Sequence, residues 1–532
     1  MTSRRPRLRW DLGGAAAAAT VELCADRGCS QSLGSATVDA SGAAATPDGE
    51  LPSGVVFWRV HAGGQVSATW ELFVGKRSAP VDTSYGAILD LDGDGVPDVA
   101  ASTKSGGVAI YFGGAAGLMR APLVIANPDG AKASFGYQVI AAGDLDGDGF
   151  GDLAVGECDP KGSRVHVYFG AGGGAATSRT QALDSPDGMS GFGCRLAAAG
   201  DLDGDGFADL AVARVGLDFS GGLYIYRGGA GGLPATAPRI DSPDYHPSRL
   251  GYSLAGIGDI DGDGFDDLAA TEIDYSALSG RLHVYFGGPG GISNQHQVTL
   301  LSPDPSGLQF GASVASAGDL DGDGHPDLVV ASPAVSATKV PPKAHVYLGG
   351  PGAIKSGAVP IDLEMSGVVG LDGEVEGAGD LDGDGYDDLV ASSPDQLVAF
   401  FGRAGGIAPD GVSVAAAGQG TNPRHLASAG DLDGDGMSDL LVGDGAGLEL
   451  FLGGAGGLDR ARLIAVTPPG GAGGAVCRVS RPRKPRRIAK PAVRSFASRA
   501  RRGALETRLR ATPIVVFSRA FLGGGASLAR SL

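Results

Sequence analysis

Seven short acidic segments carry the residues whose types and spacing could do chemistry. Each follows the pattern Asp-x-Asp-Gly-Asp-Gly-x-x-Asp, and the copies begin at Asp90, Asp144, Asp201, Asp259, Asp319, Asp380 and Asp431. On a tight loop the side chains at positions 1, 3 and 5 turn inward, where their carboxylates can surround a hard cation. Position 7 adds a backbone carbonyl, and position 9 adds a further acid, directly or through water. The pattern therefore predicts seven oxygen-rich cation sites.

The predicted ligand set has the same form in every copy, with aspartate at positions 1, 3, 5 and 9 and a backbone carbonyl at position 7. Copy by copy, these positions hold Asp90, Asp92, Asp94, Val96 and Asp98; Asp144, Asp146, Asp148, Phe150 and Asp152; Asp201, Asp203, Asp205, Phe207 and Asp209; Asp259, Asp261, Asp263, Phe265 and Asp267; Asp319, Asp321, Asp323, His325 and Asp327; Asp380, Asp382, Asp384, Tyr386 and Asp388; and Asp431, Asp433, Asp435, Met437 and Asp439. Glycine at positions 4 and 6 permits backbone conformations that a Cβ would hinder.

Calcium is the cation that these loops favour. A flexible loop with oxygen ligands alone suits the six to eight ligands of Ca²⁺ better than Mg²⁺, and zinc or copper would call for His or Cys. The loop is not an EF-hand, because position 12 is a small apolar residue such as Val155 instead of a bidentate Glu. Solvated turn residues are the alternative interpretation. Four acids within nine residues would repel one another without a cation, so we predict about seven structural Ca²⁺ ions.

The segments around each loop predict the elements that position it. A short alternating segment precedes the loop (Gly136–Gly143), an apolar run follows it (Asp152–Val155), then a strand ending in glycine (Val165–Gly170), and a further extended segment, as in Gln297–Ser302. The copies recur every 51 to 61 residues, and no segment shows a helical period. A sheet of four short strands buries both faces only by stacking in a ring. The sequence thus predicts an all-β, seven-bladed β-propeller over residues 79–469.

Two segments of different character flank the repeats. Residues 1–78 hold strand-like pieces and three tryptophans, Trp10, Trp58 and Trp70, which predict part of a β-sandwich of the fibronectin type III or immunoglobulin kind. Alternatively, the last strand of this segment helps to close the ring. Residues 470–532 predict a basic tail of low order, because from Cys477 onward 15 Lys and Arg face one acid, Glu506. An arm for an anionic surface and translation in a wrong frame are the alternatives.

Composition excludes several function classes. The residues before Cys477 carry 27 basic and 59 acidic side chains, so phosphates would be repelled and no nucleic-acid partner is expected. No stretch of 18 apolar residues could span a membrane as a helix. The start of the chain only faintly resembles a signal peptide, and a start placed inside a longer gene is the expected reason. Cys24 with Cys29, and Cys158 with Cys194, could form disulfides or remain buried thiols.

The repeats resemble FG-GAP repeats, also called VCBS-type repeats, which build the propellers of integrin α-subunits and of many bacterial surface proteins. The FG element stands at Phe135-Gly136, Phe192-Gly193 and Phe310-Gly311, with variants at Leu250-Gly251 and Val369-Gly370. The GAP element is degenerate, as in Val155–Glu157, Ala331–Pro333 and Ala391–Pro394, and the seventh copy lacks a clear FG. Over about 390 residues, the resemblance implies a seven-bladed propeller with calcium in its loops, on the face opposite the usual ligand-binding face. Adhesion or recognition is implied only loosely.

We therefore expect a secreted or cell-surface recognition module for a glycan or an extracellular protein, with no transmembrane helix. A passive scaffold of a larger surface protein ranks second, and a polysaccharide lyase or hydrolase ranks third. No GxSxG or HExxH motif occurs, so no enzyme is predicted. His166, His283 and His345 share one strand position, which indicates packing. Five acids outside the loops are interpreted as surface charges, and five residues before the fourth and seventh loops are guesses at ligand contacts. These are Glu157, Glu272, Glu364, Glu374 and Glu376, and Tyr245, His246, Arg249, Arg424 and His425.

Overall fold

The computed structural model contains β-strands and no helix among the residues that it describes. These are residues 3–9, 19–38, 44–49, 51–52, 54–67, 69–74, 77–82, 89–92, 97–113, 121–130, 134–148, 150–159, 163–171, 178–215, 221–243, 249–274, 279–303, 309–333, 342–350, 354, 360–364, 374–392, 396–416, 425–432, 437–443, 448–466 and 472–476. Within them, no helix is long and apolar enough to cross a membrane.

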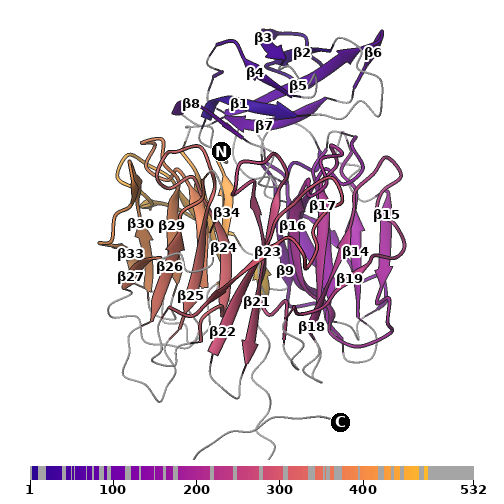
Figure 1. Ribbon diagram of the computed structural model, residues 1–532, viewed down its shortest axis with the longest axis vertical. Coiled ribbons are helices and arrows are strands. Elements are labelled where there is room, and N and C mark those ends of the chain that lie inside the picture. Colours follow the sequence, from indigo (N-terminus) through magenta and orange to yellow (C-terminus); the bar gives the residue numbers. More distant parts are fainter. Residues whose placement is uncertain are drawn as a thin grey trace, which may run out of the picture. The chain divides into compact units, whose positions relative to one another are not determined.

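The described strands of the repeat region form seven four-stranded antiparallel sheets, here called blades 1 to 7 (Figure 1). Blade 1 contains β9 (Val99–Thr103), β10 (Val108–Tyr111), β11 (Leu123–Ile125) and β38 (Ala472–Val476); blade 2 contains β12 (Phe135–Gly143), β13 (Asp152–Glu157), β14 (Arg164–Tyr168) and β15 (Thr180–Asp184); blade 3 contains β16 (Phe192–Gly200), β17 (Asp209–Val215), β18 (Gly221–Tyr226) and β19 (Arg239–Ile240); and blade 4 contains β20 (Leu254–Gly258), β21 (Asp267–Asp274), β22 (Ser279–Tyr285) and β23 (Gln297–Leu301).

The remaining blades follow the same order of strands, first to fourth, in sequence and in space. Blade 5 contains β24 (Ser313–Gly318), β25 (Asp327–Ser332), β26 (Lys343–Tyr347) and β27 (Ile361–Glu364); blade 6 contains β28 (Glu374–Gly379), β29 (Asp388–Ser392), β30 (Gln396–Phe400) and β33 (Val412–Ala416), with the short hairpin β31 (Gly402–Arg403) and β32 (Gly406–Ile407) beside it in sequence; and blade 7 contains β34 (His425–Gly430), β35 (Asp439–Gly443), β36 (Leu448–Leu452) and β37 (Asp459–Val466). The prediction of an all-β propeller built from the repeats is confirmed.

Hydrophobic cores lie between neighbouring blades and explain why second strands such as β13 are buried on both faces. Ile140 and Val165 of blade 2, for example, pack with Phe192, Leu196 and Val212 of blade 3 in one fully buried cluster. Equivalent clusters join blades 1 and 2, 3 and 4, 4 and 5, 5 and 6, and 6 and 7. A strand that is buried on both faces reads as a continuous apolar run, which is what Asp152–Val155 shows.

The ring closes between blade 7 and blade 1, a point that the sequence left open. Val99 and Ala101 of blade 1 share a buried cluster with Leu441 and Leu450 of blade 7. The strand β38 pairs antiparallel with β9, so the end of the repeat region supplies the strand of blade 1 that stands where blades 2 to 7 have their first strand. The alternative closure by the last strand of the N-terminal segment is wrong, because β8 (Arg77–Asp82) pairs with β1 (Ser3–Arg9). The range predicted as tail therefore begins with a propeller strand.

The N-terminal segment forms a separate eight-stranded sheet. Its other strands are β2 (Thr20–Cys24), β3 (Ser32–Val38), β4 (Ala44–Pro47), β5 (Gly54–Ala62), β6 (Gln65–Val66) and β7 (Trp70–Val74). Leu23, Val56, Trp58 and Val60 belong to its core. Classification of this sheet as part of a fibronectin or immunoglobulin sandwich stays a prediction, and Trp10 lies outside the described residues.

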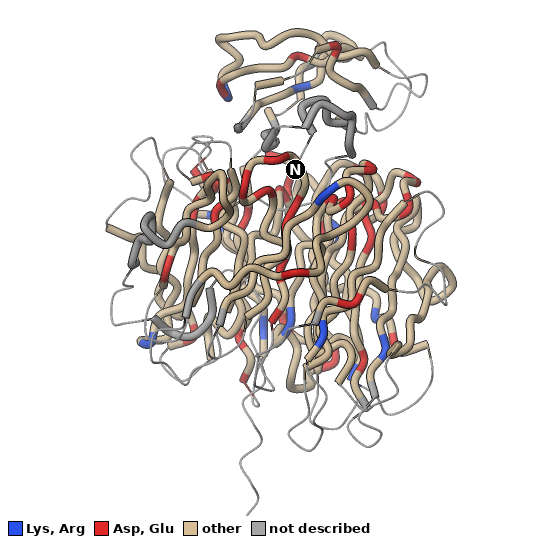
Figure 2. The backbone as a smooth tube through the Cα atoms, turned by 90° about the vertical axis from the view of Figure 1, so that its left-hand side faces the viewer, with Lys and Arg blue, Asp and Glu red and all other residues tan. Residues whose placement is uncertain are grey.

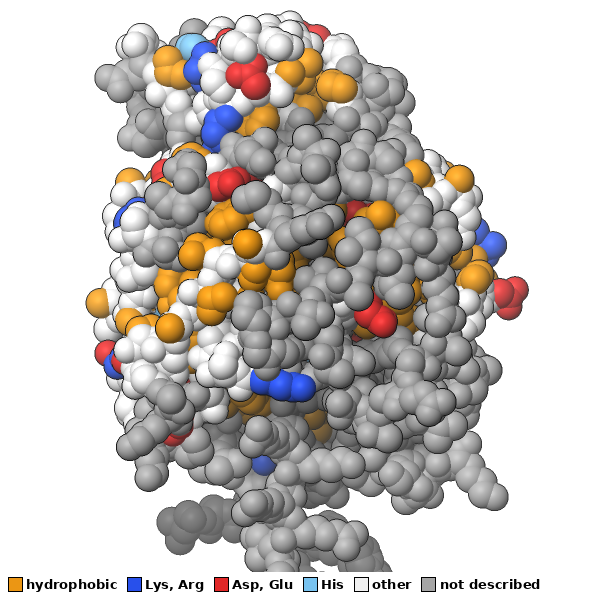
Figure 3. All heavy atoms as spheres, turned by 180° about the vertical axis from the view of Figure 1, so that it is seen from behind, with side chains coloured by type: hydrophobic (Ala, Val, Ile, Leu, Met, Phe, Trp, Pro, Cys, Tyr) orange, Lys and Arg blue, Asp and Glu red, His pale blue; other side chains and the backbone are white. Residues whose placement is uncertain are grey.

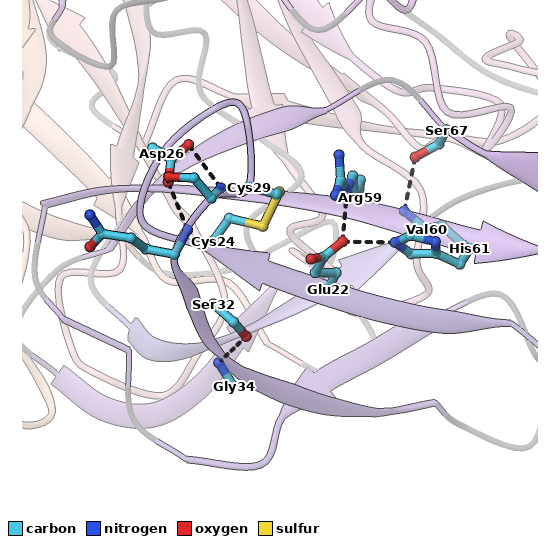
Figure 4. The surroundings of a disulfide bond; sticks show 12 residues. Glu22, Cys24, Asp26, Cys29, Ser32, Gly34, Arg59, Val60, His61 and Ser67 are labelled. Atoms are coloured by element: carbon cyan, nitrogen blue, oxygen red, sulfur yellow. Dashed lines mark hydrogen bonds and ion pairs between the residues drawn. A yellow bond between two sulfur atoms is a disulfide. The ribbon is translucent and has the colours of Figure 1, made fainter.

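Both cysteine pairs that the spacing suggested are bonded. Cys24 and Cys29 close a short loop after β2, beside Glu22, which accepts a hydrogen bond from Arg59 at 2.7 Å (Figure 4). Cys158 joins the end of β13 to Cys194 in β16 and so links blade 2 to blade 3. The described part of the surface seen from behind shows hydrophobic and uncharged side chains with few charges among them (Figure 3).

Candidate metal centres

In blades 2 to 7 the acidic loops connect the first strand of a blade to its second strand. In blade 2, for example, the loop begins at Asp144, directly after β12, and ends at Asp152, the first residue of β13. Many acidic segments gather at the upper end of the propeller strands, whereas most Lys and Arg lie towards the lower end (Figure 2). We call these two ends of the blades the loop end and the opposite end.

In the second to sixth loops, whose turns are described, the aspartate at position 1 folds the loop around its own carboxylate. Asp201 Oδ1 accepts hydrogen bonds from the backbone N–H groups of Gly204 at 2.7 Å and Asp205 at 3.0 Å, and its Oδ2 accepts one from Gly206 at 2.9 Å. Asp380 makes the same three bonds in blade 6. Because the turn bends the backbone around this side chain, the carboxylates at positions 3 and 5 are brought towards the same centre.

The aspartate at position 9 ties the loop to the end of the third strand. In blade 3, Asp209 Oδ2 accepts a hydrogen bond from Leu202 N at 3.1 Å, and its Oδ1 accepts one from Gly228 N at 2.9 Å. The same pair of bonds occurs in all seven blades, where the acceptors are Asp98, Asp152, Asp209, Asp267, Asp327, Asp388 and Asp439. Each carboxylate oxygen keeps a second lone pair for a cation.

The loops bring the predicted carboxylates together. In the first two loops the oxygens at positions 1, 3 and 9 lie within 4.8 Å of one another, and in the third loop those at positions 1, 3 and 5 do. The residues concerned are Asp90, Asp92 and Asp98; Asp144, Asp146 and Asp152; and Asp201, Asp203 and Asp205. Four predicted ligands, Asp94, Val96, Asp433 and Asp435, lie outside the described residues. Clusters of oxygen donors of this kind fit a hard divalent cation.

Burial makes the negative charge at position 9 costly without a cation. Loss of water contact raises the pKa of Asp98, Asp152 and Asp209 to about 8, against the lowering effect of the two backbone hydrogen bonds. Burial likewise raises the pKa of Asp267 and Asp388 to about 9, and neighbouring loop aspartates add to the rise. A divalent ion in the loop would favour the ionised form and remove this cost.

Two loops also receive an arginine from their own blade. The guanidinium of Arg179, beside β15, contacts the carboxylate of Asp146 at position 3. In blade 3, Arg227 Nη1 lies 2.9 Å from Asp203 Oδ2, again at position 3. These cations partly neutralise their loops and would compete with a metal ion for the same carboxylate.

Neighbouring loops are hydrogen-bonded to each other across the blades, which the sequence analysis missed. In five loops the backbone N–H at position 8 donates to the carbonyl at position 1 of the preceding loop, as Ala208 does to Asp144 at 2.9 Å; in the first and fifth loops position 8 is Pro97 or Pro326, which has no N–H to donate. In two blades the position-8 side chain joins in, because Asp266 Oδ2 accepts from Asp201 N at 2.7 Å and Asp387 Oδ2 accepts from Asp319 N at 2.8 Å. The Asp-Asp doublets at these points were the available sequence signal.

The acids outside the loops are not the surface charges that we expected. Glu157, Glu272, Glu374 and Glu376 are all buried, because they lie on strands that pack between two blades. Of Glu364, only the backbone in β27 is described.

The remaining candidates are described only in part. His166, His283 and His345 are buried, as packing predicts, yet each lies within 3.2 Å of a polar side-chain atom. Tyr245, His246 and Arg424 lie outside the described residues. Arg249 precedes blade 4, and His425 begins β34, where it is buried beside Glu374.

Comparisons with known proteins agree on the repeats. A family model for an FG-GAP-like repeat matches residues 90–155, 144–212, 201–270 and 380–476, and an FG-GAP repeat model matches residues 310–349. The chain is 35% identical over 175 residues to integrin alpha-7 of Homo sapiens (31% of this chain, 14% of that protein) and 34% identical over 236 residues to integrin alpha-V of Gallus gallus (39% and 22%). It thus spans less than a quarter of the length of these relatives. A solved structure of a prolyl endopeptidase is 14% identical, and the match covers 85% of this chain and 50% of the endopeptidase chain. Its TM-score of 0.37 is too low to support an argument.

Proposed function

Because the chain belongs to the FG-GAP repeat family, we propose that its β-propeller is a calcium-binding recognition module that works outside the cell. One observation carries the metal part of this proposal. The position-9 carboxylates are buried in every blade, although in the first six loops two or three further aspartates are described beside them. Keeping these carboxyl groups ionised at neutral pH is costly unless a cation shares their charge. All-oxygen donors on a flexible loop favour Ca²⁺.

The calcium ions would act structurally in this proposal. In loops two to six, where all the predicted ligands are described, the aspartates at positions 1, 3, 5 and 9 and the carbonyl at position 7 would hold the ion. The ion supplies positive charge that offsets the repulsion between carboxylates. Since position 1 also accepts the N–H of the next loop through its carbonyl, a filled loop would also stabilise the contact between two blades.

An extracellular location follows from the same chemistry. Loops of this kind can have the weak affinity typical of extracellular calcium modules, which would leave them empty in a cytosol with little free calcium. The disulfides Cys24–Cys29 and Cys158–Cys194 also suit an oxidising compartment. The ligand that we propose is a glycan or an extracellular protein. The loop end is nearly the same in every blade, so ligand specificity would lie with residues that differ between blades.

A binding screen of the full chain tests the proposal. The protein is applied to a glycan array and to immobilised matrix proteins, once with Ca²⁺ and once with EDTA, and a thermal melt under each condition reports whether the propeller is folded. Binding that occurs with Ca²⁺ and is lost with EDTA would support recognition and identify the ligand class. A folded protein that binds nothing in either condition would contradict recognition and favour a scaffold. Equal melting in both conditions would contradict structural calcium.

A further inference from the structure

A cavity of about 420 Å³ opens between blade 1 and blade 2, away from the acidic loops. Its walls come from β11, from the connection that follows it, and from β14 and β15 of blade 2. Leu123 and Ile125 supply apolar wall, while Tyr168, Thr180 and Gln181 add polar groups. Apolar walls with a few converging polar groups are typical of sites for small ligands.

Asp129 and His166 line this cavity, and the buried carboxylate of Glu157 lies next to them. His166 Nε2 lies 3.2 Å from Glu157 Oε2 and 3.7 Å from Asp129 Oδ2. The side chains of Glu157 and His166 are 4% and 7% exposed, whereas Asp129, at the cavity wall, is 37% exposed. The three ligand atoms all lie within 4.8 Å of one another. Unlike the loops, this cluster includes nitrogen.

The spacing of these atoms suits a small transition metal. Zinc binds His nitrogen and carboxylate oxygen at about 2.0–2.2 Å with tetrahedral geometry, which places its ligand atoms roughly 3.3–3.6 Å apart. The two distances measured from His166 Nε2 lie on either side of that range. One imidazole with two carboxylates also matches the preference of Zn²⁺ and related ions over Ca²⁺, which takes oxygen ligands alone.

Arg164 orients the exposed carboxylate. Its Nη1 donates to both oxygens of Asp129, at 3.0 and 2.8 Å, while Nε and Nη2 donate to Asp184 at 3.0 and 2.7 Å. A hydrogen bond of this kind fixes a metal-binding carboxylate without replacing it as a ligand. Because Asp184 holds the other edge of the guanidinium, Arg164 is anchored and does not enter the cluster.

The equivalent positions in blade 3 show what a blade without such a site contains. There Asp187 corresponds to Asp129, but Arg214 replaces Glu157 and Tyr224 replaces His166. Arg214 Nε lies 3.3 Å from Asp187 Oδ2, and the Tyr224 hydroxyl donates to the same oxygen at 3.1 Å. A built-in guanidinium therefore supplies the positive charge in blade 3. In blade 2 that position carries an acid.

We propose that Asp129, Glu157 and His166 form a binding site for one divalent metal ion of the zinc class, separate from the calcium loops. Three protein ligands leave at least one coordination position of such an ion unfilled, and two of the three, Asp129 and His166, line the cavity. An oxygen of a small ligand in the cavity would take this position. The site makes ligand binding between blades 1 and 2 dependent on this second metal.

Metal binding to the full chain tests the proposal directly. The protein is saturated with Ca²⁺ to fill the loops and then titrated with Zn²⁺ by equilibrium dialysis, with Co²⁺ as a second probe for its visible absorption. We expect one tightly held Zn²⁺ that excess Ca²⁺ does not displace. The variant His166→Gln removes a ligand, so its Zn²⁺ affinity should fall by more than about 100-fold, beyond the 10–100-fold typical of residues that only orient ligands.

Matched variants separate this site from general effects on the fold. His345→Gln changes the same strand position in blade 5, where Ser332 stands in place of the glutamate, and should leave Zn²⁺ binding unchanged. Asp129→Asn alters the exposed ligand and should weaken binding even if His166→Gln fails to fold. Zinc affinity and cobalt absorption that are the same in wild type, His166→Gln and Asp129→Asn would overturn the proposal, as would loss of binding in His345→Gln alone.

Discussion

The two ends of the blades are built on opposite plans. At the loop end every blade repeats one arrangement, in which the position-9 aspartate accepts two backbone hydrogen bonds, as Asp209 does from Leu202 and Gly228. At the opposite end the blades differ. The same place holds Asp129, Glu157 and His166 in blade 2, and Asp187, Arg214 and Tyr224 in blade 3.

The comparison distinguishes residues that every repeat shares, at the loop end, from residues that differ between repeats, at the opposite end. The loops hold neighbouring blades together through backbone hydrogen bonds, so a change in one loop affects two blades. The opposite end also has links between blades, such as the disulfide Cys158–Cys194, but these links are not repeated in the same form, and blades can carry different polar clusters there. In repeat proteins the shared positions serve the fold, and individual positions are free to serve a ligand.

Chelation should produce the largest effect, because it acts on all loops at once. At tenfold excess over its dissociation constant, a cation stabilises by roughly 1.4 kcal/mol per site, so seven sites would contribute on the order of 10 kcal/mol. We expect EDTA to lower the melting temperature by on the order of 10 °C or more, measured by calorimetry. Recovery with Ca²⁺ but not with Mg²⁺ is the control. A melting temperature unchanged by EDTA would mean that bound Ca²⁺ at the loop end does not stabilise the fold.

The pH dependence of stability should differ with and without calcium. The folded pKa of Asp152 is about 8, whereas an unfolded aspartate titrates near 3.9. The folded state thus binds more protons at neutral pH, and in EDTA the stability should fall from pH 5 to pH 8. Calcium binds the ionised form, so its stabilising effect should grow over the same interval. Thermal melts in both conditions at each pH give the difference, and a constant difference would contradict the mechanism.

Much of the loop end could be predicted from the sequence, because its geometry is local. The spacing of Asp201, Asp203 and Asp205 already places three carboxylates on one turn, and Gly204 and Gly206 supply the N–H groups that the first of them accepts. The alternating and apolar runs likewise indicated four strands per repeat. Local patterns of this kind do not depend on which blade lies next in the ring.

The opposite end could not be predicted, because its partners come from distant parts of the chain. Asp129 lies 37 positions before His166, and no pattern in the sequence connects them. Glu157 resembled a surface charge until the packing of blade 3 against β13 showed it to be buried. Ring closure by β38 depends on a strand almost 370 residues after β9. These features depend on tertiary contacts, which a single sequence does not reveal.

A single position-9 aspartate should have the next largest effect. The variant Asp209→Ala leaves the N–H groups of Leu202 and Gly228 without their acceptor, at about 1–3 kcal/mol each, so we expect a loss of about 2–6 kcal/mol in urea unfolding. Asp209→Asn keeps one oxygen acceptor and removes a buried charge, so in EDTA it should cost less than alanine. With Ca²⁺ present the losses of unfolding free energy in the two variants should become more similar, because both variants lose a calcium ligand. Equal losses in EDTA would mean that the hydrogen bonds contribute little.

The smallest change in stability should come from replacing single glycines by alanine. Two glycines that differ in their neighbours distinguish the cost of backbone strain from the cost of disturbing the contact between adjacent loops. Gly204, in the third loop, and Gly188, before blade 3, both have positive φ, +75° and +65°. A Cβ at Gly204 would lie 2.6 Å from the ring of Phe265 in the next loop, whereas a Cβ at Gly188 would meet nothing within 4 Å. Alanine at either position costs about 1–2 kcal/mol in backbone strain, and Gly204→Ala should cost more because Phe265 must move. We expect only Gly204→Ala to weaken Ca²⁺ binding, measured by calorimetric titration. If both variants lose the same stability and bind Ca²⁺ equally well, contact between adjacent loops does not support the loop end.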